Sequence, residues 1–181
     1  WRGWTRANTV DLALMERMAD SNCMALCIGV ESGSQTILDN LRKGTTVEDN
    51  RKALKAINEA GMYARASLIV GSPGETWKTV QETIDFVIET EPDDWLLSIF
   101  VPVPGSEAFV DADKYGIRFL EDANRISYYS NFFVTGGDMV SGQVMEYEHL
   151  RREEIMEMRN HVFETLMEKC PPKLHRAEGL R

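Results

Sequence analysis

Residues 71–76, with the sequence GSPGET, are the stretch of this chain best suited to ligand chemistry. They directly follow a short apolar run, and a helical pattern begins at once behind them. Gly71 and Gly74 allow close approach of the backbone to a ligand, because glycine has no Cβ and accepts positive φ. Ligands of parallel α/β proteins bind at the carboxyl ends of strands. These residues therefore form a candidate ligand-binding rim.

Other common catalytic motifs do not fit the residues present. In the run GVESG at 29–33 the serine is one position late for a nucleophile elbow. Residues 71–76 lack the lysine of a P-loop and the third glycine of a dinucleotide fingerprint. His149, His161 and His175 lack metal-ligand spacing and are expected on the surface or on a helix face.

The composition limits the classes of protein that are compatible with the chain. With 181 residues, 43% of them hydrophobic, it can bury one sizeable core. The net charge of −9 argues against a surface dedicated to nucleic acid or an anionic membrane. No apolar run approaches the ~20 residues of a membrane span. Three cysteines make no disulfide framework, which favours a cytoplasmic location. Because the chain opens on Trp1, we expect a fragment of a longer protein.

The apolar pattern predicts parallel strands that alternate with helices. The non-alternating apolar run at 24–30 is typical of a strand buried on both faces. Further apolar strands are expected at 63–70 and 95–101, and residues 1–6 are a candidate fourth strand. Sequential strands separated by helices indicate a parallel sheet with right-handed crossovers. We therefore predict an α/β fold: a partial (β/α) barrel of about four parallel strands with outer helices, plus a C-terminal helix.

Capping residues indicate where the helices begin. Asn8 or Thr9 is expected to cap the first helix, with Leu14 among its inward residues. Thr45 and Glu48 have the spacing of a capping box. Further helices are expected after Ser34, after Thr76, at 107–115 and at 146–168, and an ordered aromatic loop at 126–144.

Four motifs, taken together, resemble the carboxyl half of the radical S-adenosylmethionine (SAM) superfamily. They are CIGVESGSQ at 27–35, LRKG at 41–44, IVGSPGET at 69–76 and FVPVPGS at 100–106. The likeness is greatest to the subgroup with an upstream cobalamin-binding domain, such as the anaerobic magnesium-protoporphyrin IX monomethyl ester oxidative cyclase. It implies that residues 1–116 are the carboxyl half of the barrel, and that 117–181 are a C-terminal aromatic loop and helical extension.

The resemblance implies cofactors whose metal ligands lie outside this chain. In that superfamily a 4Fe-4S cluster on a Cys-x-x-x-Cys-x-x-Cys loop binds SAM and cleaves it reductively to a 5′-deoxyadenosyl radical. Cys23 and Cys27 have the first spacing, but Val30 occupies the third position. Cys23, Cys27 and Cys170 are therefore interpreted as core or turn residues. Cobalamin, if used, is expected in the upstream domain.

The resemblance also implies SAM contacts at the strand ends. Glu31 and Ser32 match the pair that hydrogen-bonds the ribose or methionine part, although Glu31 could instead cap the helix after Ser34. Lys43 matches the residue that pairs with the SAM carboxylate, and the alternative is a solvated charge favoured by the helix dipole.

The resemblance also implies SAM contacts at two further strand ends. Ser67, Ile69 and Gly71 match the motif that contacts ribose and adenine, although Ile69 is equally suited to the core. Val101 would offer its backbone to adenine. Arg6 is an additional candidate for contact with SAM. Glu75 is interpreted as a partner of the helix dipole. No catalytic residue is assigned.

The expected function is that of a fragment of a radical SAM iron–sulfur enzyme, inactive alone. The parent would perform oxidative or methyl-transfer chemistry on a small organic substrate, with tetrapyrrole cyclisation as one option. It would receive electrons from a protein such as flavodoxin or ferredoxin and would bind neither nucleic acid nor membrane. The first alternative is a non-catalytic βα domain that acts as a binding or scaffold module. The second is an unrelated α/β domain without affinity for SAM.

Overall fold

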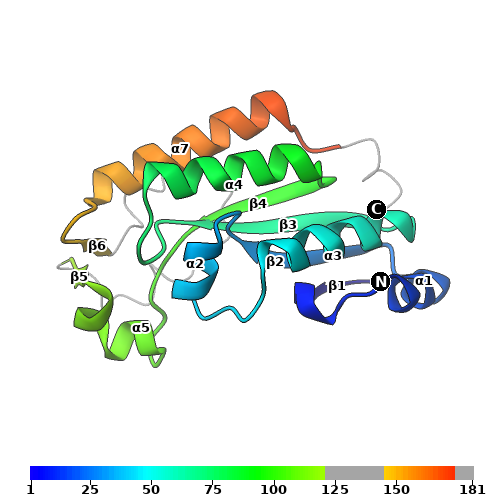
Figure 1. Ribbon diagram of the computed structural model, residues 1–181, viewed down its shortest axis with the longest axis horizontal. Coiled ribbons are helices and arrows are strands. Elements are labelled where there is room, and N and C mark those ends of the chain that lie inside the picture. The colour runs from blue at the N-terminus through cyan, green and yellow to red at the C-terminus, as the bar shows by residue number, and fades with distance from the viewer. Residues whose placement is uncertain (121–144, 174–181) are drawn as a thin grey trace.

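A four-stranded parallel sheet is the centre of the molecule (Figure 1). The computed structural model describes residues 1–120 and 145–173. The strands are adjacent in chain order: β1 Arg2–Thr5, β2 Ala25–Glu31, β3 Tyr63–Val70 and β4 Asp94–Ile99. All three strand pairs are parallel, and a helical segment separates each strand from the next. The predicted partial (β/α) barrel, with residues 1–6 as its fourth strand, is confirmed.

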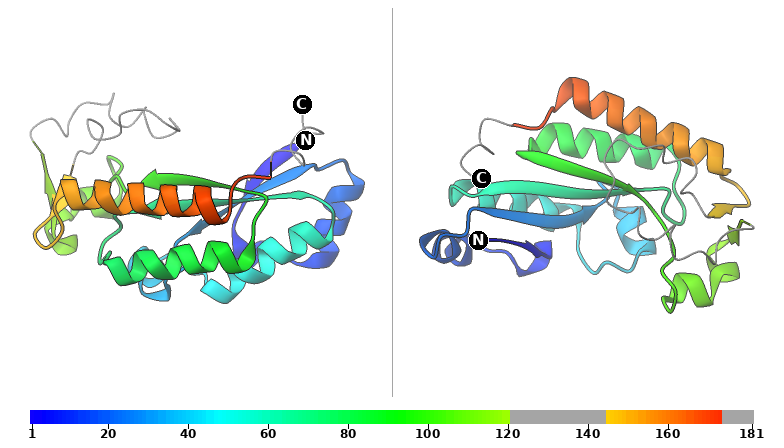
Figure 2. Two further views of the ribbon diagram at one scale, coloured as in Figure 1. Left: turned by 90° about the horizontal axis from the view of Figure 1, so that it is seen from above. Right: turned by 180° about the vertical axis from the view of Figure 1, so that it is seen from behind.

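Helices connect and cover these strands. The α-helices are α1 Leu12–Asp20, α2 Gln35–Asn40, α3 Val47–Glu59, α4 Trp77–Thr90, α5 Glu107–Val110 and α7 Arg152–Lys169. Short 3-10 turns, η1 Ala7–Thr9 and η2 Ala112–Tyr115, accompany α1 and α5. Figure 2 shows β1 and β4 at opposite edges of the sheet, with α7 beside β4.

The two faces of the sheet differ in burial. On one face Ile28, Leu68 and Leu97 are buried in the core together with apolar residues of α3, α4 and α7. On the other face, Gly29 is paired in register with Ser67, and Ser67 with Leu96. These three residues are only half-buried, because helices cover the opposite face. We call this second side the open face.

Two predicted caps are displaced from their observed positions. Helix α1 is capped by Asp11, which accepts a hydrogen bond from the backbone of Leu14, rather than by Asn8 or Thr9. Leu14 is 40% exposed rather than buried. The capping box of α3 is formed by Thr46 and Asp49, so the predicted box at 45 and 48 is wrong by one residue.

Other predicted caps are confirmed or refined. Thr76 accepts from the backbone of Thr79, which confirms it as the N-cap of α4. Ser34 is the N-cap of α2 by position, but its side chain makes no capping hydrogen bond.

The C-terminal segment differs most from its prediction. Residues 145–147, of which the last two were expected in the final helix, are strand β6 (Met145–Tyr147), antiparallel to β5 (Ile117–Phe119). Helix α7 begins only at Arg152, and its apolar face is buried as predicted. The predicted aromatic loop at 126–144 lies outside the described residues. The division at residue 116 stays a prediction.

The β5–β6 ribbon lies at the carboxyl end of the sheet. Figure 1 shows β3 and β4 running toward the side of the molecule where α5, β5 and β6 lie. The hydroxyl of Tyr147 on β6 donates to the backbone oxygen of Gly71, just past β3, at 2.8 Å. Within the described residues, no helix is long and apolar enough to cross a bilayer.

Candidate functional site

An ion pair between Glu31 and Lys43 occupies the carboxyl end of β2. Nζ of Lys43 donates to Oε1 of Glu31, and the two side chains are 20% and 13% exposed. Glu31 has φ +62°, a left-handed conformation that costs energy in a non-glycine residue. The register between β2 and β3 also shifts between Gly29 and Glu31. This irregular backbone is thus the local geometry that holds the Glu31 carboxylate beside Lys43, and the carboxylate does not cap α2.

Gly29 provides the space for this pair. A Cβ at residue 29 would lie 2.5 Å from Oε1 of Glu31 and 2.8 Å from Nζ of Lys43, closer than real Cβ contacts. Any other residue would force both charged groups to move. The absence of a side chain at 29 is therefore what lets the pair lie over the strand end.

Arg6, just after the end of β1, contacts the loop that carries Lys43. Its Nη2 donates to the backbone oxygen of Lys43. The nearby Asn8 side chain donates to the oxygen of Gly44 at 3.4 Å. The structure thus brings the additional candidate Arg6 against the loop that carries Lys43.

Ser67 and Ile69 continue the site along β3. They alternate with the buried Leu68 and Val70 and so belong to the open face. The register places Ser67 beside Gly29, above which the Glu31–Lys43 pair lies. One surface therefore presents a carboxylate, an ammonium, a hydroxyl and an apolar side chain. Such a surface can accept from ligand hydroxyls, pair with a ligand carboxylate and pack against a ring.

Ser32 does not belong to this surface. It is fully buried, and its hydroxyl is 2.9 Å from that of Thr83 on α4 and accepts from the backbone of Ser34 at 3.0 Å. Gly33 donates to the same Thr83 hydroxyl at 3.0 Å. Because the chain turns toward α4 after Glu31, Ser32 lies in the interior and away from the open face, and its expected contact with a cofactor stays a prediction.

Gly71 lies at the carboxyl end of β3, where packing is tight. It has φ +81°, and a Cβ there would lie 2.7 Å from Cγ2 of Ile155 on α7. Its carbonyl accepts the Tyr147 hydrogen bond described above. Val101, two residues beyond β4, is half-buried. Gly71 thus lets α7 approach the rim, and its backbone, like that of Val101, is at a strand end.

Glu75 lies in an environment that its sequence context does not reveal. It precedes the N-cap Thr76, as the dipole interpretation requires, but it is only 2% exposed. Burial raises the pKa of this carboxyl to about 7, although hydrogen bonds from Thr79 and from the backbone of Ser72 and Gly71 oppose the shift. The carboxyl can therefore change charge near neutral pH.

The three cysteines are buried thiols. Cys23, Cys27 and Cys170 are 4%, 6% and 6% exposed, which confirms their assignment to the core, and none forms a disulfide. Burial raises the pKa of Cys27 to about 12. Over residues 1–120 and 145–173, no group of three His, Cys, Asp or Glu side chains is arranged to hold a metal ion. These residues therefore do not fit an iron–sulfur cluster.

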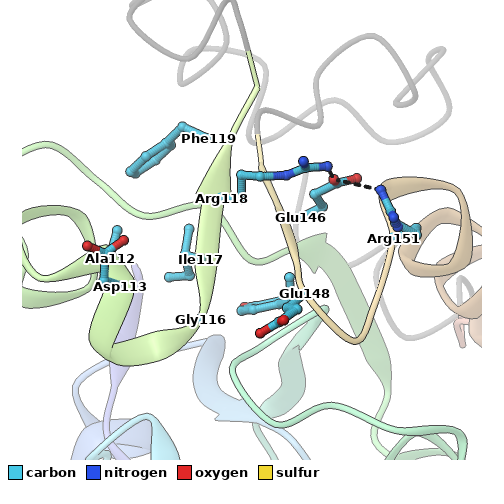
Figure 3. Close-up of a pocket in the computed structure, with 10 residues that line it drawn as sticks. Ala112, Asp113, Gly116, Ile117, Arg118, Phe119, Glu146, Glu148 and Arg151 are labelled. Carbon is cyan, nitrogen blue, oxygen red and sulfur yellow. Dashed lines mark hydrogen bonds and ion pairs between the residues drawn. The ribbon is translucent and has the colours of Figure 1, made fainter.

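A depression of about 580 Å³ beside the β5–β6 ribbon was missed by the sequence analysis (Figure 3). Its walls come from η2, from both strands of the ribbon and from the residues before α7. The charged side chains that line it are Asp113, Arg118, Glu146, Glu148 and Arg151. No sequence signal pointed to it, because each strand has three residues and their pairing joins segments that are distant in the chain.

Comparison with known proteins connects this geometry to one family. The family model described as the radical SAM superfamily matches residues 5–87. An uncharacterized methyltransferase of Pyrococcus horikoshii is 32% identical over 106 residues, 59% of this chain and 23% of that protein. The anaerobic magnesium-protoporphyrin IX monomethyl ester cyclase of Cereibacter sphaeroides is 30% identical over 138 residues, 75% of this chain and 21% of the cyclase.

Solved structures show the same fold. A radical S-adenosylmethionine methyltransferase from Kitasatospora setae superimposes with a TM-score of 0.65 at 16% identity, over 89% of this chain and 36% of that one. The present chain spans less than a quarter of the length of the two curated relatives.

Proposed function

Residues 5–87 match the model of the radical SAM superfamily, and from that similarity we propose that this chain holds the nucleoside and amino-acid part of SAM. The observation that carries the proposal is the Glu31–Lys43 pair at the end of β2, with Ser67 and Ile69 beside it on the open face. The parent protein would be a radical SAM enzyme, of which these strands are one side of the barrel.

Each residue has a role that follows from its position. Glu31 would accept hydrogen bonds from the ribose hydroxyls, and Lys43 would pair with the ligand carboxylate. Ser67 would contact the ribose and Ile69 would pack on adenine, while the backbone of Gly71 and Val101 would border the ring. Ser32 would act indirectly, by holding the turn after Glu31 against Thr83 on α4.

Lys43 and Glu31 form an ion pair with each other in the structure. A ligand that binds either group must therefore compete with this ion pair. An ammonium that is 20% exposed is already partly desolvated, which strengthens its attraction to an incoming carboxylate. The same pair keeps both groups in place before the ligand arrives. Preorganisation of this kind reduces the entropy lost on binding.

The cluster is proposed to lie outside the described residues, since these do not fit it. In the complete enzyme, a 4Fe-4S cluster held by the rest of the protein, with SAM, would supply radical chemistry for an oxidative or methyl-transfer reaction. Cobalamin, a reductant protein such as flavodoxin or ferredoxin, a cytoplasmic location and a small organic substrate belong to the same proposal. Tetrapyrrole cyclisation remains one option, supported by the similarity to the cyclase.

The test is a titration of the 181-residue chain with S-adenosylhomocysteine, which has the nucleoside and amino-acid parts and needs no cluster. We expect backbone amide signals of Glu31, Ser67 and Gly71 to shift in NMR spectra. Glu31→Gln should weaken binding about tenfold, because a charge-assisted hydrogen bond contributes roughly 1.5–3 kcal/mol. The matched control, Glu48→Gln, changes an exposed carboxylate on α3.

The first alternative, a non-catalytic scaffold, shares the lack of a cluster site in the described residues with the proposed enzyme, whose cluster would lie elsewhere. A Cys-x-x-x-Cys-x-x-Cys motif upstream in the parent protein would support the enzyme over this scaffold. The second alternative, an unrelated α/β domain, predicts no binding of S-adenosylhomocysteine. Absence of shifts at millimolar ligand, or shifts confined to other surfaces, would overturn the proposed cofactor site in favour of that second alternative.

A further inference from the structure

Two arginines in the depression beside the β5–β6 ribbon share one buried carboxylate. Arg118 on β5 and Arg151 before α7 both donate to Oε1 of Glu146, Arg151 from Nη1 at 3.4 Å (Figure 3). The Glu146 side chain is 6% exposed, whereas the arginine side chains are 65% and 62% exposed. The carboxylate therefore anchors two guanidinium groups that remain accessible to solvent.

The balance of charge restricts what this depression can bind. Glu146 offsets one of the two arginines, which leaves one positive charge at that end of the depression. Asp113 and Glu148 also line it and are exposed. A polyanion would be repelled by these two carboxylates, whereas a single negative group beside the arginines is favoured.

The depression also has apolar walls and adjoins the proposed cofactor surface. Ile117 is buried and Phe119 is partly buried on β5. Tyr147 lines the depression, and its hydroxyl is bonded to the carbonyl of Gly71 at the end of β3. A ligand seated here would therefore lie beside the strand end at which the cofactor is proposed to bind.

We propose that this depression binds the carboxylate of a small organic monocarboxylate with an apolar body, held by Arg118 and Arg151, and that this molecule is the substrate. The assignment as substrate rests on the proposed function. Arginine suits the task, because its planar fork of donors matches a carboxylate. Two guanidinium groups already fixed by Glu146 lose less conformational freedom on binding than free side chains would.

The experiment uses the full 181-residue chain, isotope-labelled at arginine, and monitors the side-chain Nε–H signals by NMR. Three probes share one phenyl body: phenylpropionate with one carboxylate, phenylsuccinate with two, and phenethylamine with an amine. We expect phenylpropionate to shift the Arg118 and Arg151 signals, and the other two probes to bind at least about tenfold more weakly. Equal binding of the three probes would overturn the proposal.

Single variants locate the site without leaving Glu146 unpaired. Arg118→Gln and Arg151→Gln each keep the other arginine on Glu146, so the ribbon retains its buried ion pair. Each should weaken phenylpropionate binding at least about tenfold, because a charge-assisted hydrogen bond is lost. The control Arg51→Gln removes an arginine that pairs with Glu48 and Glu89 on the helices and should change nothing.

The outcomes separate this proposal from the cofactor proposal, because no SAM-like ligand is present. Loss of binding in both depression variants, with binding unchanged in the control, supports the site whatever the result with S-adenosylhomocysteine. Unchanged binding in either depression variant overturns it, even if S-adenosylhomocysteine binds at Glu31 and Ser67. Thermal melting of each variant checks that a loss of binding is not a loss of folding.

Discussion

Gly29 lies directly beneath the carboxylate of Glu31, so close that a Cβ on Gly29 would be 2.5 Å from Oε1. Both residues belong to β2, and the left-handed backbone at Glu31 turns its side chain over the glycine. The charged end of the proposed cofactor site therefore depends on a position that carries no functional group.

Gly29→Ala should weaken binding of S-adenosylhomocysteine about tenfold and change stability little. The groups that collide with the new methyl are the flexible ends of two side chains, which can swing away, but the Glu31–Lys43 pair is then displaced. Calorimetric titration and urea unfolding measure the two effects. The control is Gly3→Ala on β1, where the nearest atom is at an ordinary 3.6 Å. Unchanged affinity in Gly29→Ala would contradict the role given to this pair.

Gly33→Ala should instead destabilise the fold by roughly 2–3 kcal/mol, the range of severe overpacking. A Cβ there would lie 2.5 Å from the backbone oxygen of Glu82 and 2.7 Å from Cα of Thr83. Helix backbone cannot move aside as a side chain can, so β2 and α4 must separate. Urea unfolding measures the loss, and a change below about 0.5 kcal/mol would show that α4 does not pack as described.

Glu75 should make the protein less stable as pH rises toward neutrality. Burial raises its folded-state pKa from 4.5 to about 7, so between these values the folded chain holds a proton that the unfolded chain releases. The free energy of unfolding then falls with increasing pH in this window, by at most about 3 kcal/mol.

Glu75→Gln, which stays neutral, should lack this loss and be the more stable protein at pH 8. Urea unfolding between pH 4.5 and 8 gives the comparison. Glu59→Gln, at a half-exposed position on α3, serves as the control and should keep the parental pH dependence. Parallel pH profiles of the parent and Glu75→Gln would contradict the buried position of this carboxyl.

The cysteines should resist alkylation while the protein is folded. Cys27 is 6% exposed and its thiol pKa is raised to about 12, so the reactive thiolate is scarce at pH 8. Iodoacetamide followed by mass spectrometry should detect little modification of Cys23, Cys27 or Cys170 before urea is added, and full modification afterwards. Rapid labelling of native Cys27 would place it on the surface instead.

The strand pattern could be predicted from the sequence because β2, β3 and β4 are mostly apolar or small residues and helical segments separate them, although only one face of the sheet is fully buried. Residues 63–70 form β3 with the predicted bounds, and Thr76 caps α4. The predicted capping box of α3 was wrong by one residue because Thr45 and Thr46 are adjacent and each is followed three residues later by an acidic residue. Only the packing of Thr45 in the interior decides between them.

The sequence by itself determined the βα order, the apolar faces and the motifs that resemble a radical SAM barrel, because these depend on local periodicity and on residues close in the chain. Tertiary structure alone decided that Ser32 faces α4 and that Lys43 meets Glu31. It also decided that Tyr147 reaches Gly71 and that Glu146 gathers two arginines. Each of these facts depends on segments brought together by packing, and no spacing along the chain encodes which face of a turn its side chains will occupy.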